Sequence, residues 1–332
     1  MITEEQTVSS EQVLTVKNLH VHYVTDDGTA EAVNGIDFSI KPGETLGLVG
    51  ESGAGKTTTA LSIMRLVPDP PGKIIQGEML FQGENLLKKS DREMRRIRGN
   101  KISMIFQDPM TSLNPVFTIG RQIAENVQLH QVVSQKKAME RAREMLEIVG
   151  IPAARVNNYP HEFSGGMKQR VVIAMALACN PALLIADEPT TALDVTIQAQ
   201  ILEIMKRLKE EFNSAMIMIS HDLGVVSEIS ERVAVMYAGD LVEVGDTEEV
   251  FDNPKHPYTI GLLNSIPDID AEREERLKPI DGLMPDAMEL PEGCSFNPRC
   301  PHVMDRCRRE KPPMYDLGDG HTAECFLFSG GK

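Results

Sequence analysis

The stretch GESGAGKTT at residues 50–58 decides the fold expected for this chain. It fits the pattern G-x-x-x-x-G-K-[ST], and it lies between a short apolar segment, 45–49, and a helical segment, 56–66, which is the context that the pattern requires. In that context glycines let backbone N–H groups converge on phosphate oxygens, a lysine neutralises their charge, and a hydroxyl binds Mg²⁺. A glycine turn that binds nothing is the alternative. We predict a nucleotide-phosphate site made of Gly50, Glu51, Ser52, Gly53, Ala54, Gly55, Lys56, Thr57 and Thr58.

Strand and helix patterns alternate on both sides of this loop. Two early segments alternate apolar and polar residues and predict strands of an antiparallel edge sheet, 13–23 and 32–40. Short apolar segments predict further strands at 45–49, 101–106, 182–186, 215–220 and 233–237, and periodic segments predict helices at 56–66, 87–98, 167–179 and 196–212. Residues 108–170 read as a helical subdomain inserted into this core. The fold class is therefore α/β with a largely parallel sheet.

Polar residues end several of the predicted strands. Asp187 and Glu188 follow an apolar strand, where the first carboxylate can hold Mg²⁺ and the second can polarise an attacking water. Gln107 ends another strand and could reach Mg²⁺ or that water, and His221 ends a third and could contact the γ-phosphate. Carboxyl ends of parallel strands share one edge of a sheet, which favours a common site. The alternatives are a solvated strand end for the carboxylates and a structural role for the histidine.

A second anion site is predicted at the start of the helix over 167–179. Ser164, Gly165, Gly166 and Met167 would present free N–H groups and the positive end of the helix dipole. Plain N-capping by the serine is the alternative. Two phosphate-binding helix starts in one chain suggest a nucleotide sandwiched between two chains. Tyr23, 27 residues before the first glycine, could stack on the adenine ring, although an isolated aromatic residue is more often part of a core.

Residues 12–253 resemble the nucleotide-binding domain of an ABC ATPase. Residues 50–58 are similar to its Walker A loop, Gln107 to its Q-loop, 183–188 to Walker B, and 191–194 with Asp194 to the D-loop. Residues 163–167 are similar to the signature LSGGQ, with Phe163 and Met167 replacing the Leu and Gln, and His221 resembles the switch histidine. The resemblance implies a RecA-like P-loop core that binds ATP and Mg²⁺. It also implies ATP hydrolysis in a head-to-tail dimer, in which each signature contacts the ATP of the partner chain.

Two further stretches narrow the resemblance. QDPMTSLNPVFTIG at 107–120 and NPKHPYT at 253–259, with a cysteine-rich tail, look like the oligopeptide/dipeptide subfamily of bacterial importers. The resemblance implies an ATPase that powers peptide uptake with two transmembrane permease subunits, a second related ATPase (identical or different) and an extracytoplasmic solute-binding protein. Such a chain would be peripheral, on the cytoplasmic face of the membrane. The subfamily also imports nickel, glutathione and oligosaccharides, so the solute stays open.

Charge and hydropathy limit the other function classes. With 49 acidic and 34 basic residues the net charge is −15, which disfavours nucleic acid as the main partner. No secretory signal and no apolar run near the roughly 20 residues of a membrane span is evident. A non-transport ABC ATPase acting in DNA repair, translation or iron–sulfur assembly is the alternative of another class. The acidic balance and the single nucleotide-binding domain disfavour it.

The tail, residues 254–332, is expected to be a loop-rich extension with cysteines. Cys294, Cys300, Cys307 and Cys325 are spaced C-x5-C-x6-C-x17-C, without the close pair usual in zinc sites. This spacing favours a 4Fe–4S cluster, which the resemblance also implies. Zinc and unligated or disulfide-forming thiols are the alternatives, and a redox-gated role for the tail is a further hypothesis. His321 could replace one ligand or be a surface histidine. We expect the charge of four neighbouring arginines to lower the pKa of the thiols: Arg299, Arg306, Arg308 and Arg309.

Overall fold

The computed structural model describes residues 12–107, 112–191, 193–265 and 279–330. These residues form two compact units, each assembled from separate segments of the chain. Unit 1 contains the described parts of 1–15, 39–44 and 79–218. Unit 2 contains 16–38, 45–78 and the described parts of 219–332. The phosphate-binding loop and the cysteine tail therefore belong to the same unit.

Unit 2 is built on a sheet whose strands come from distant parts of the chain. β3 (Thr45–Val49) is buried at all five positions and pairs in parallel with β9 (Arg232–Tyr237). A turn reverses the chain into β10 (Asp240–Asp246), which is antiparallel to β9. The short strands β12 (Thr322–Ala323) and β11 (Tyr315–Asp316) continue the sheet from β10. The end of the chain is thus held to the same sheet as β3.

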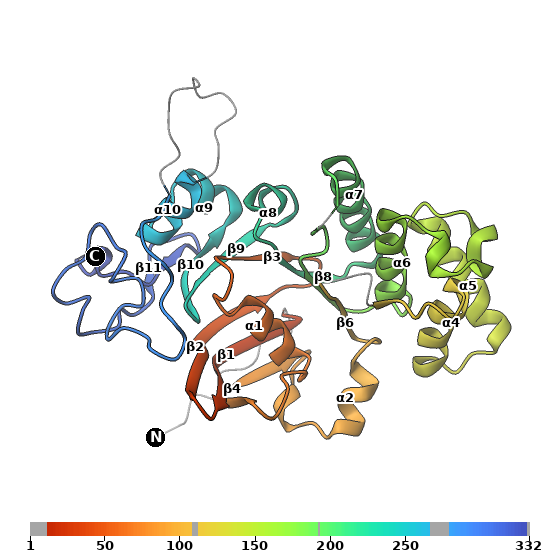
Figure 1. Cartoon of the computed structure of the whole chain (residues 1–332), viewed down its shortest axis with the longest axis horizontal. Coiled ribbons are helices and arrows are strands. Elements are labelled where there is room, and N and C mark those ends of the chain that lie inside the picture. The colour runs from red at the N-terminus through yellow and green to blue at the C-terminus, as the bar shows by residue number, and fades with distance from the viewer. Residues whose placement is uncertain (1–11, 108–111, 192, 266–278, 331–332) are drawn as a thin grey trace. The chain divides into compact units, whose positions relative to one another are not determined.

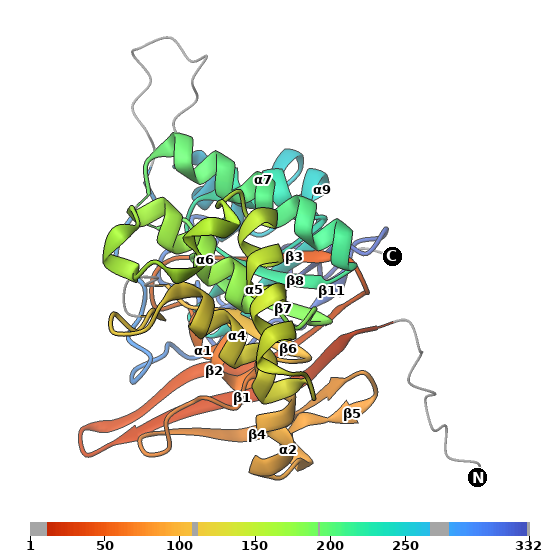
Figure 2. The same cartoon turned by 90° about the vertical axis from the view of Figure 1, so that its right-hand side faces the viewer.

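A long hairpin supplies most of the second sheet. β1 (Leu14–Thr25) and β2 (Gly28–Ile40) are joined by two residues, and β1 lies beside β4 (Gly72–Phe81). Figure 2 shows the extended hairpin, with β4 alongside it. The strands predicted at 13–23 and 32–40 are confirmed, whereas β4 was not predicted. The helix α1 (Lys56–Ile63) follows β3 after the phosphate-binding loop, as predicted, although it ends earlier than residue 66.

Unit 1 combines parallel strands with a group of helices. β6 (Ile102–Ile105) and β7 (Leu183–Asp187) are parallel and fully buried, and β8 (Ala215–Ile219) lies next to β7. The helices α4, α5 and α6 pack on one another (Figure 1), in the region predicted to be helical. Their bounds are α4 Ile119–His130, α5 Gln135–Ile148, α6 Gly165–Leu177 and, beyond them, α7 Val195–Phe212.

Helix caps explain where the predicted helices start and stop. The helix predicted over 87–98 is divided, because Ser90 forms a capping box with Glu93 that starts α2 (Asp91–Ile97) afresh. Asn213 adopts a left-handed conformation and ends α7 just before β8. The remaining short elements of unit 1 are β5 Glu84–Asn85, η1 Leu86–Lys88, η2 Ala153–Asn157 and η3 Pro160–Glu162.

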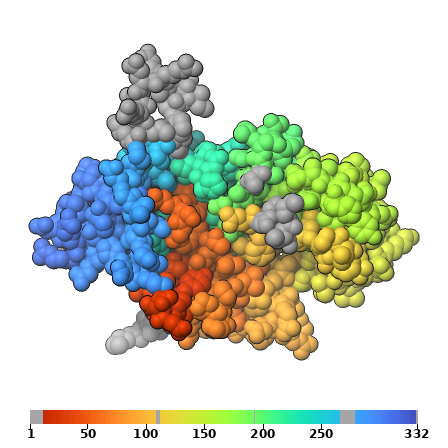
Figure 3. All heavy atoms as spheres, in the orientation of Figure 1, coloured from red at the N-terminus to blue at the C-terminus, as the bar shows by residue number. Residues whose placement is uncertain are grey.

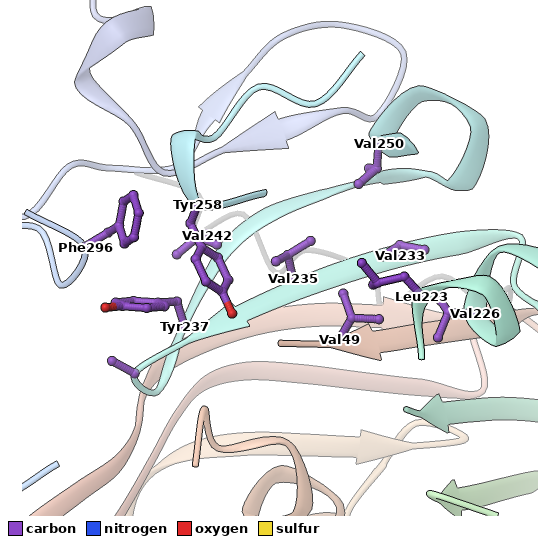
Figure 4. Close-up of a cluster of buried hydrophobic side chains, with 11 residues drawn as sticks. Val49, Leu223, Val226, Val233, Val235, Tyr237, Val242, Val250, Tyr258 and Phe296 are labelled. Atoms are coloured by element: carbon purple, nitrogen blue, oxygen red, sulfur yellow. The ribbon is translucent and has the colours of Figure 1, made fainter. Parts of the chain in front are cut away.

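The C-terminal part of unit 2 shares its core instead of building one of its own. Tyr258 and Phe296 pack with Val49, Val235 and Tyr237 in one buried cluster (Figure 4). The surface view shows the C-terminal residues, in blue, packed against the red and orange surface of unit 2 (Figure 3), where Glu31 N–H donates to the Ala287 carbonyl. The helices are α8 Leu223–Ile229, α9 Thr247–Asp252, α10 Pro257–Asn264 and η4 Phe326–Phe328. Within the described ranges no helix is long and apolar enough to cross a membrane.

Candidate functional site

The phosphate-binding loop has a backbone that only glycine allows. Gly50 and Gly55 have φ of 149° and 104°, in the region that side chains rarely adopt. A Cβ at Gly50 would lie 2.2 Å from the Met236 carbonyl oxygen, and one at Gly55 would lie 2.5 Å from that of Ala32. The loop is therefore fixed by close backbone neighbours on both sides, with its N–H groups at the start of α1.

Side chains complete this loop within unit 2. Lys56 is buried, and its Nζ donates to the carbonyls of Gly50 (2.8 Å) and Glu51 (2.9 Å). The Tyr23 hydroxyl lies 3.4 Å from that of Thr58, so the predicted adenine-stacking residue is beside the loop. A buried ammonium group next to N–H donors is suited to binding phosphate oxygens.

In unit 1 the predicted catalytic carboxylates end β7. Asp187 is buried, and Glu188, the next residue, has a left-handed φ of 49°. The Glu188 carboxylate accepts hydrogen bonds from Gln107 Nε2 (2.8 Å) and from the Thr191 hydroxyl (2.9 Å). Gln107 and Glu188 are thus brought together, as their strand-end positions predicted. This arrangement fixes the orientation of a carboxylate, which a general base requires.

Two of the predicted site residues cap helices in unit 1, and a third, His221, lies between a strand and a helix of unit 2. Ser164 caps α6 by accepting from Met167 N–H at 3.4 Å, and Gly165 beside it is exposed. Asp194 caps α7 by accepting from Ile197 N–H at 2.9 Å. His221 is exposed after β8, immediately before the residue that caps α8. The start of α6 is therefore open to solvent at Gly165, whereas Gly166 is half-buried and a Cβ there would lie 2.6 Å from Ile197.

The four cysteines of the tail line one small cavity of about 10 Å³ in unit 2. Cys294 N–H donates to the Cys307 carbonyl at 2.8 Å, which joins two of the segments that carry them. None of these cysteines forms a disulfide, so that alternative is wrong for this structure.

Three of the thiols have a raised pKa, not the lowered one that was predicted. Burial raises the pKa of Cys294 to about 12 and also raises the pKa of Cys300 and Cys325. The neighbouring arginines are directed elsewhere: Arg299 binds Glu51, and Arg306 stacks on a phenylalanine ring and pairs with Glu310. A bound cation would have to supply the charge that stabilises thiolates here.

His256 also lines the cysteine cavity and has an unused donor. Its Nδ1 accepts from Tyr258 N–H at 3.1 Å, so the neutral ring carries its proton on Nε2. Burial lowers its pKa to about 3, and the buried Nε2 has no protein partner. In the described ranges, no three or more His, Cys, Asp or Glu side chains form a group that could hold a metal ion. Four cysteine side chains and this N–H donor therefore line the same cavity.

Two buried residues of unit 2, His321 and Glu243, have roles that the sequence did not predict. His321, considered as a ligand or a surface residue, is neither, because it is buried and its Nε2 lies 2.7 Å from the Glu243 carboxylate. The same fully buried Glu243 also accepts from the N–H groups of Lys255 and His256. Neither residue belongs to a recognisable sequence motif. The one sequence signal is that Glu243 lies within an apolar strand, where a carboxylate must find buried hydrogen-bond partners.

Comparison with known proteins identifies the family. Residues 33–191 match the model described as ABC transporter, and 242–307 match that of the oligopeptide/dipeptide transporter C-terminal region. The chain is 54% identical to a probable peptide ABC transporter ATP-binding protein of Sinorhizobium fredii, over 95% of this chain and 94% of that protein. It is 52% identical to the dipeptide transport ATP-binding protein of Bacillus subtilis, over 96% and 95%.

Solved structures agree with this assignment. The chain is similar to a dimeric ATP-binding cassette in a post-hydrolysis state bound to ADP and phosphate, with 29% identity and a TM-score of 0.63. The similarity covers 70% of this chain and 98% of that one. It is also similar to cbiO1 of Clostridium perfringens, with 27% identity, a TM-score of 0.63, and coverage of 73% and 92%. The chain therefore belongs to the ABC transporter family, as an ATP-hydrolysing subunit with the C-terminal region of oligopeptide/dipeptide transporters.

Proposed function

We propose that this chain powers the uptake of dipeptides or oligopeptides through partner permeases. The observation that carries the proposal is the C-terminal region match at 242–307, together with about 50% identity to peptide transport ATP-binding proteins along nearly the whole chain. In this proposal residues 12–253 are the ABC domain and 254–332 the extension. The chain is peripheral, on the cytoplasmic face of the membrane.

We assign ATP binding to the loop of unit 2. The N–H groups of 50–58 and the Lys56 ammonium bind the β- and γ-phosphates, Thr57 ligates Mg²⁺, and Tyr23 stacks on adenine. The glycine-only backbone and the buried lysine support this assignment. Lys56→Ala tests it, because we expect more than a hundredfold loss of ATP affinity in a chain that still folds.

We assign hydrolysis to the residues that end the strands. In this assignment Asp187 and Gln107 would bind Mg²⁺. Glu188 would polarise the attacking water, and His221 would contact the γ-phosphate. The two hydrogen bonds to the Glu188 carboxylate support its role as an oriented base. Glu188→Gln should lower ATP hydrolysis by a hundredfold or more while ATP binding is retained. A Glu188→Gln variant with normal turnover would contradict the assignment.

We assign Ser164, Gly165, Gly166 and Met167 to the ATP of a partner chain, with Asp194 in the D-loop beside it. The exposed start of α6 supports this, because its N–H groups are open to a ligand that unit 1 does not itself supply. The partner is a second related ATPase, identical or different, as in the dimeric cassette of known structure.

We propose that the permeases dock in a groove on unit 1. Its cavity is about 500 Å³, and apolar side chains from β6, α4, α6 and the loop between β6 and α4 line it: Met104, Phe106, Phe117, Leu129, Val172 and Met175. Phe106 and Leu129 are 43% and 74% exposed there, and apolar side chains gathered at one groove mark an interaction site. Residues 108–111, within the stretch 107–120 that resembles the importer subfamily, lie outside the described residues. Leu129→Glu should abolish copurification of the permeases but leave the ATPase activity of the isolated chain unchanged.

We propose that Cys294, Cys300, Cys307 and Cys325 hold a 4Fe–4S cluster. The shared cavity and the His256 N–H donor, which has no protein partner, support it. When bound, the cluster would cross-link three loop segments and could carry an electron. Four iron and four acid-labile sulfide atoms per chain, lost in Cys294→Ser, would support the cluster. One zinc atom per chain, or no metal after anaerobic purification, would refute it.

The transport proposal is tested by gentle solubilisation of membranes and purification of this chain. Two hydrophobic permeases, a second ATPase and a solute-binding protein, identified by mass spectrometry, would support an importer. The binding protein can then be screened with di- and oligopeptides, nickel, glutathione and oligosaccharides. Binding of a non-peptide solute alone would refute peptide uptake, and ribosomes or DNA in place of permeases would refute transport.

A further inference from the structure

One residue of the phosphate-binding loop, Glu51, is held by the C-terminal region through both its backbone and its side chain. Its N–H donates to the Tyr258 hydroxyl at 2.9 Å. Its carboxylate accepts from Arg299 Nη1 at 2.7 Å and from Nη2 at 3.1 Å, a bidentate pair across 248 residues of sequence. The tail therefore holds the loop at Glu51 through one backbone hydrogen bond and one ion pair.

Arg299 is built into this position. Its side chain is 4% exposed, and each of its five N–H donors has an acceptor. Besides the two oxygens of Glu51, it donates to the carbonyls of Asp281 and Ile280 and to the Tyr237 hydroxyl. Burial opposes its charge, but the hydrogen bonds to Glu51 and Tyr237 outweigh it and raise its pKa. A guanidinium this fully bonded allows the Glu51 carboxylate one orientation.

Tyr258 is equally fixed. It is fully buried, and its ring packs at 4.6 Å from that of Tyr237 and at 5.5 Å from that of Phe296 (Figure 4). Tyr237 is the last residue of β9, which pairs with β3, the strand that leads into the loop. Because the ring cannot move without disturbing this cluster, its hydroxyl is a fixed acceptor for the Glu51 N–H.

A movement of Glu51 would also change the position of Lys56, the lysine assigned to phosphate binding. Lys56 Nζ donates to the carbonyl of Glu51 as well as to that of Gly50. A loop released at Glu51 therefore also loses a defined acceptor for the ammonium group. We therefore expect weaker binding of phosphate. The rate of the chemical step should not change, because other residues carry it out.

We propose that Arg299 and Tyr258 are positioning residues that hold the phosphate-binding loop at Glu51, so that the C-terminal region sets the affinity for ATP. The proposal rests on the assignment of residues 50–58 to ATP but not on the cluster. Both positioning residues flank the cysteine cavity in sequence, since Arg299 precedes Cys300 and Tyr258 follows His256 by two. Unfolding of the tail would therefore lower ATP affinity without touching a nucleotide-binding residue.

The test is ATP affinity in the full chain, measured with a fluorescent ATP analogue and Mg²⁺. Arg299→Gln should weaken binding and raise KM about tenfold, and Tyr258→Phe about threefold, with kcat unchanged at saturating ATP. Arg299→Lys keeps the positive charge but cannot form the bidentate pair with Glu51, so it should weaken ATP binding less than Arg299→Gln does. Arg308→Gln is the matched control, because this arginine follows Cys307 on the exposed surface and should bind ATP like the wild type.

A double-mutant cycle separates positioning from general destabilisation. Glu51→Gln and Arg299→Gln should be far from additive, because either one removes the same ion pair. Additive effects, or a normal KM in a folded Arg299→Gln chain, would overturn the proposal. If Arg299→Gln does not fold, Tyr258→Phe decides, because it removes a single hydroxyl. Lys56→Ala tests the ATP-binding loop separately from the positioning residues. Normal ATP binding in this variant would refute the assignment of residues 50–58 to ATP, whatever the result for Arg299.

Discussion

The two glycine-rich helix starts of this chain differ in how they are surrounded. At the start of α1, a Cβ on Gly50 would meet a backbone oxygen at 2.2 Å, and Glu51 is held by Tyr258 and Arg299. At the start of α6, a Cβ on Gly165 would meet nothing within 4 Å. The first is a finished cradle inside its own unit. The second is an open edge, as expected for a surface that completes a site on another chain.

Exchange of one glycine in each place should show the largest difference. Gly50→Ala forces a side chain against the Met236 carbonyl at a φ of 149°, so we expect a loss of about 3 kcal/mol in stability and no measurable ATP binding. Gly165→Ala should gain about 0.5 kcal/mol, because the site accepts the methyl group and the unfolded chain loses freedom. Thermal melts and ATP titrations measure both. Equal effects in the two variants would show that the contrast in packing has no energetic meaning.

Acid should weaken the unit that holds the finished cradle. Burial lowers the pKa of His256 to about 3, against 6.5 in the unfolded chain, so below pH 6.5 only the unfolded state takes up this proton. This group contributes its full stability above pH 6.5 and loses it as the pH falls from 6.5 towards 3. Between pH 7.5 and 5.5 we expect a loss of about 1.4 kcal/mol in the free energy of unfolding.

The control for this effect is His256→Asn, which keeps a side-chain acceptor for Tyr258 N–H at the start of α10 but cannot be protonated. Urea unfolding at the two pH values should give a shallower pH dependence for this variant. An identical dependence in both chains would assign the acid sensitivity to other groups.

Features that depend on residues close in sequence were predicted, and features that depend on contacts between distant residues were missed. The helices predicted over 56–66, 167–179 and 196–212 and most strands depend on neighbours in sequence, and these elements are confirmed. The grip of Arg299 on Glu51 joins residues 248 positions apart, and no local pattern signals it. The helix α10 was missed because residues 254–332 were expected to be loop-rich, although proline, here Pro257, is favoured at a first helical position. Burial, which raises the pKa of Cys294 where adjacent arginines suggested a lowered one, is likewise a property of the folded chain.

The smallest effect separates a cap from a binding surface. Ser164→Ala removes the hydrogen bond to Met167 N–H and should cost about 1 kcal/mol in stability. Ser134→Ala is matched to it, because that serine caps α5 at the same 3.4 Å distance, and its cost should be equal. Only Ser164→Ala should also lower ATP hydrolysis, by about tenfold, because its hydroxyl is assigned to the nucleotide of a partner chain. ATP binding by the isolated chain should be unchanged in both variants. If the two variants hydrolyse ATP equally well, Ser164 is a helix cap and nothing more, and the open start of α6 has no part in the reaction.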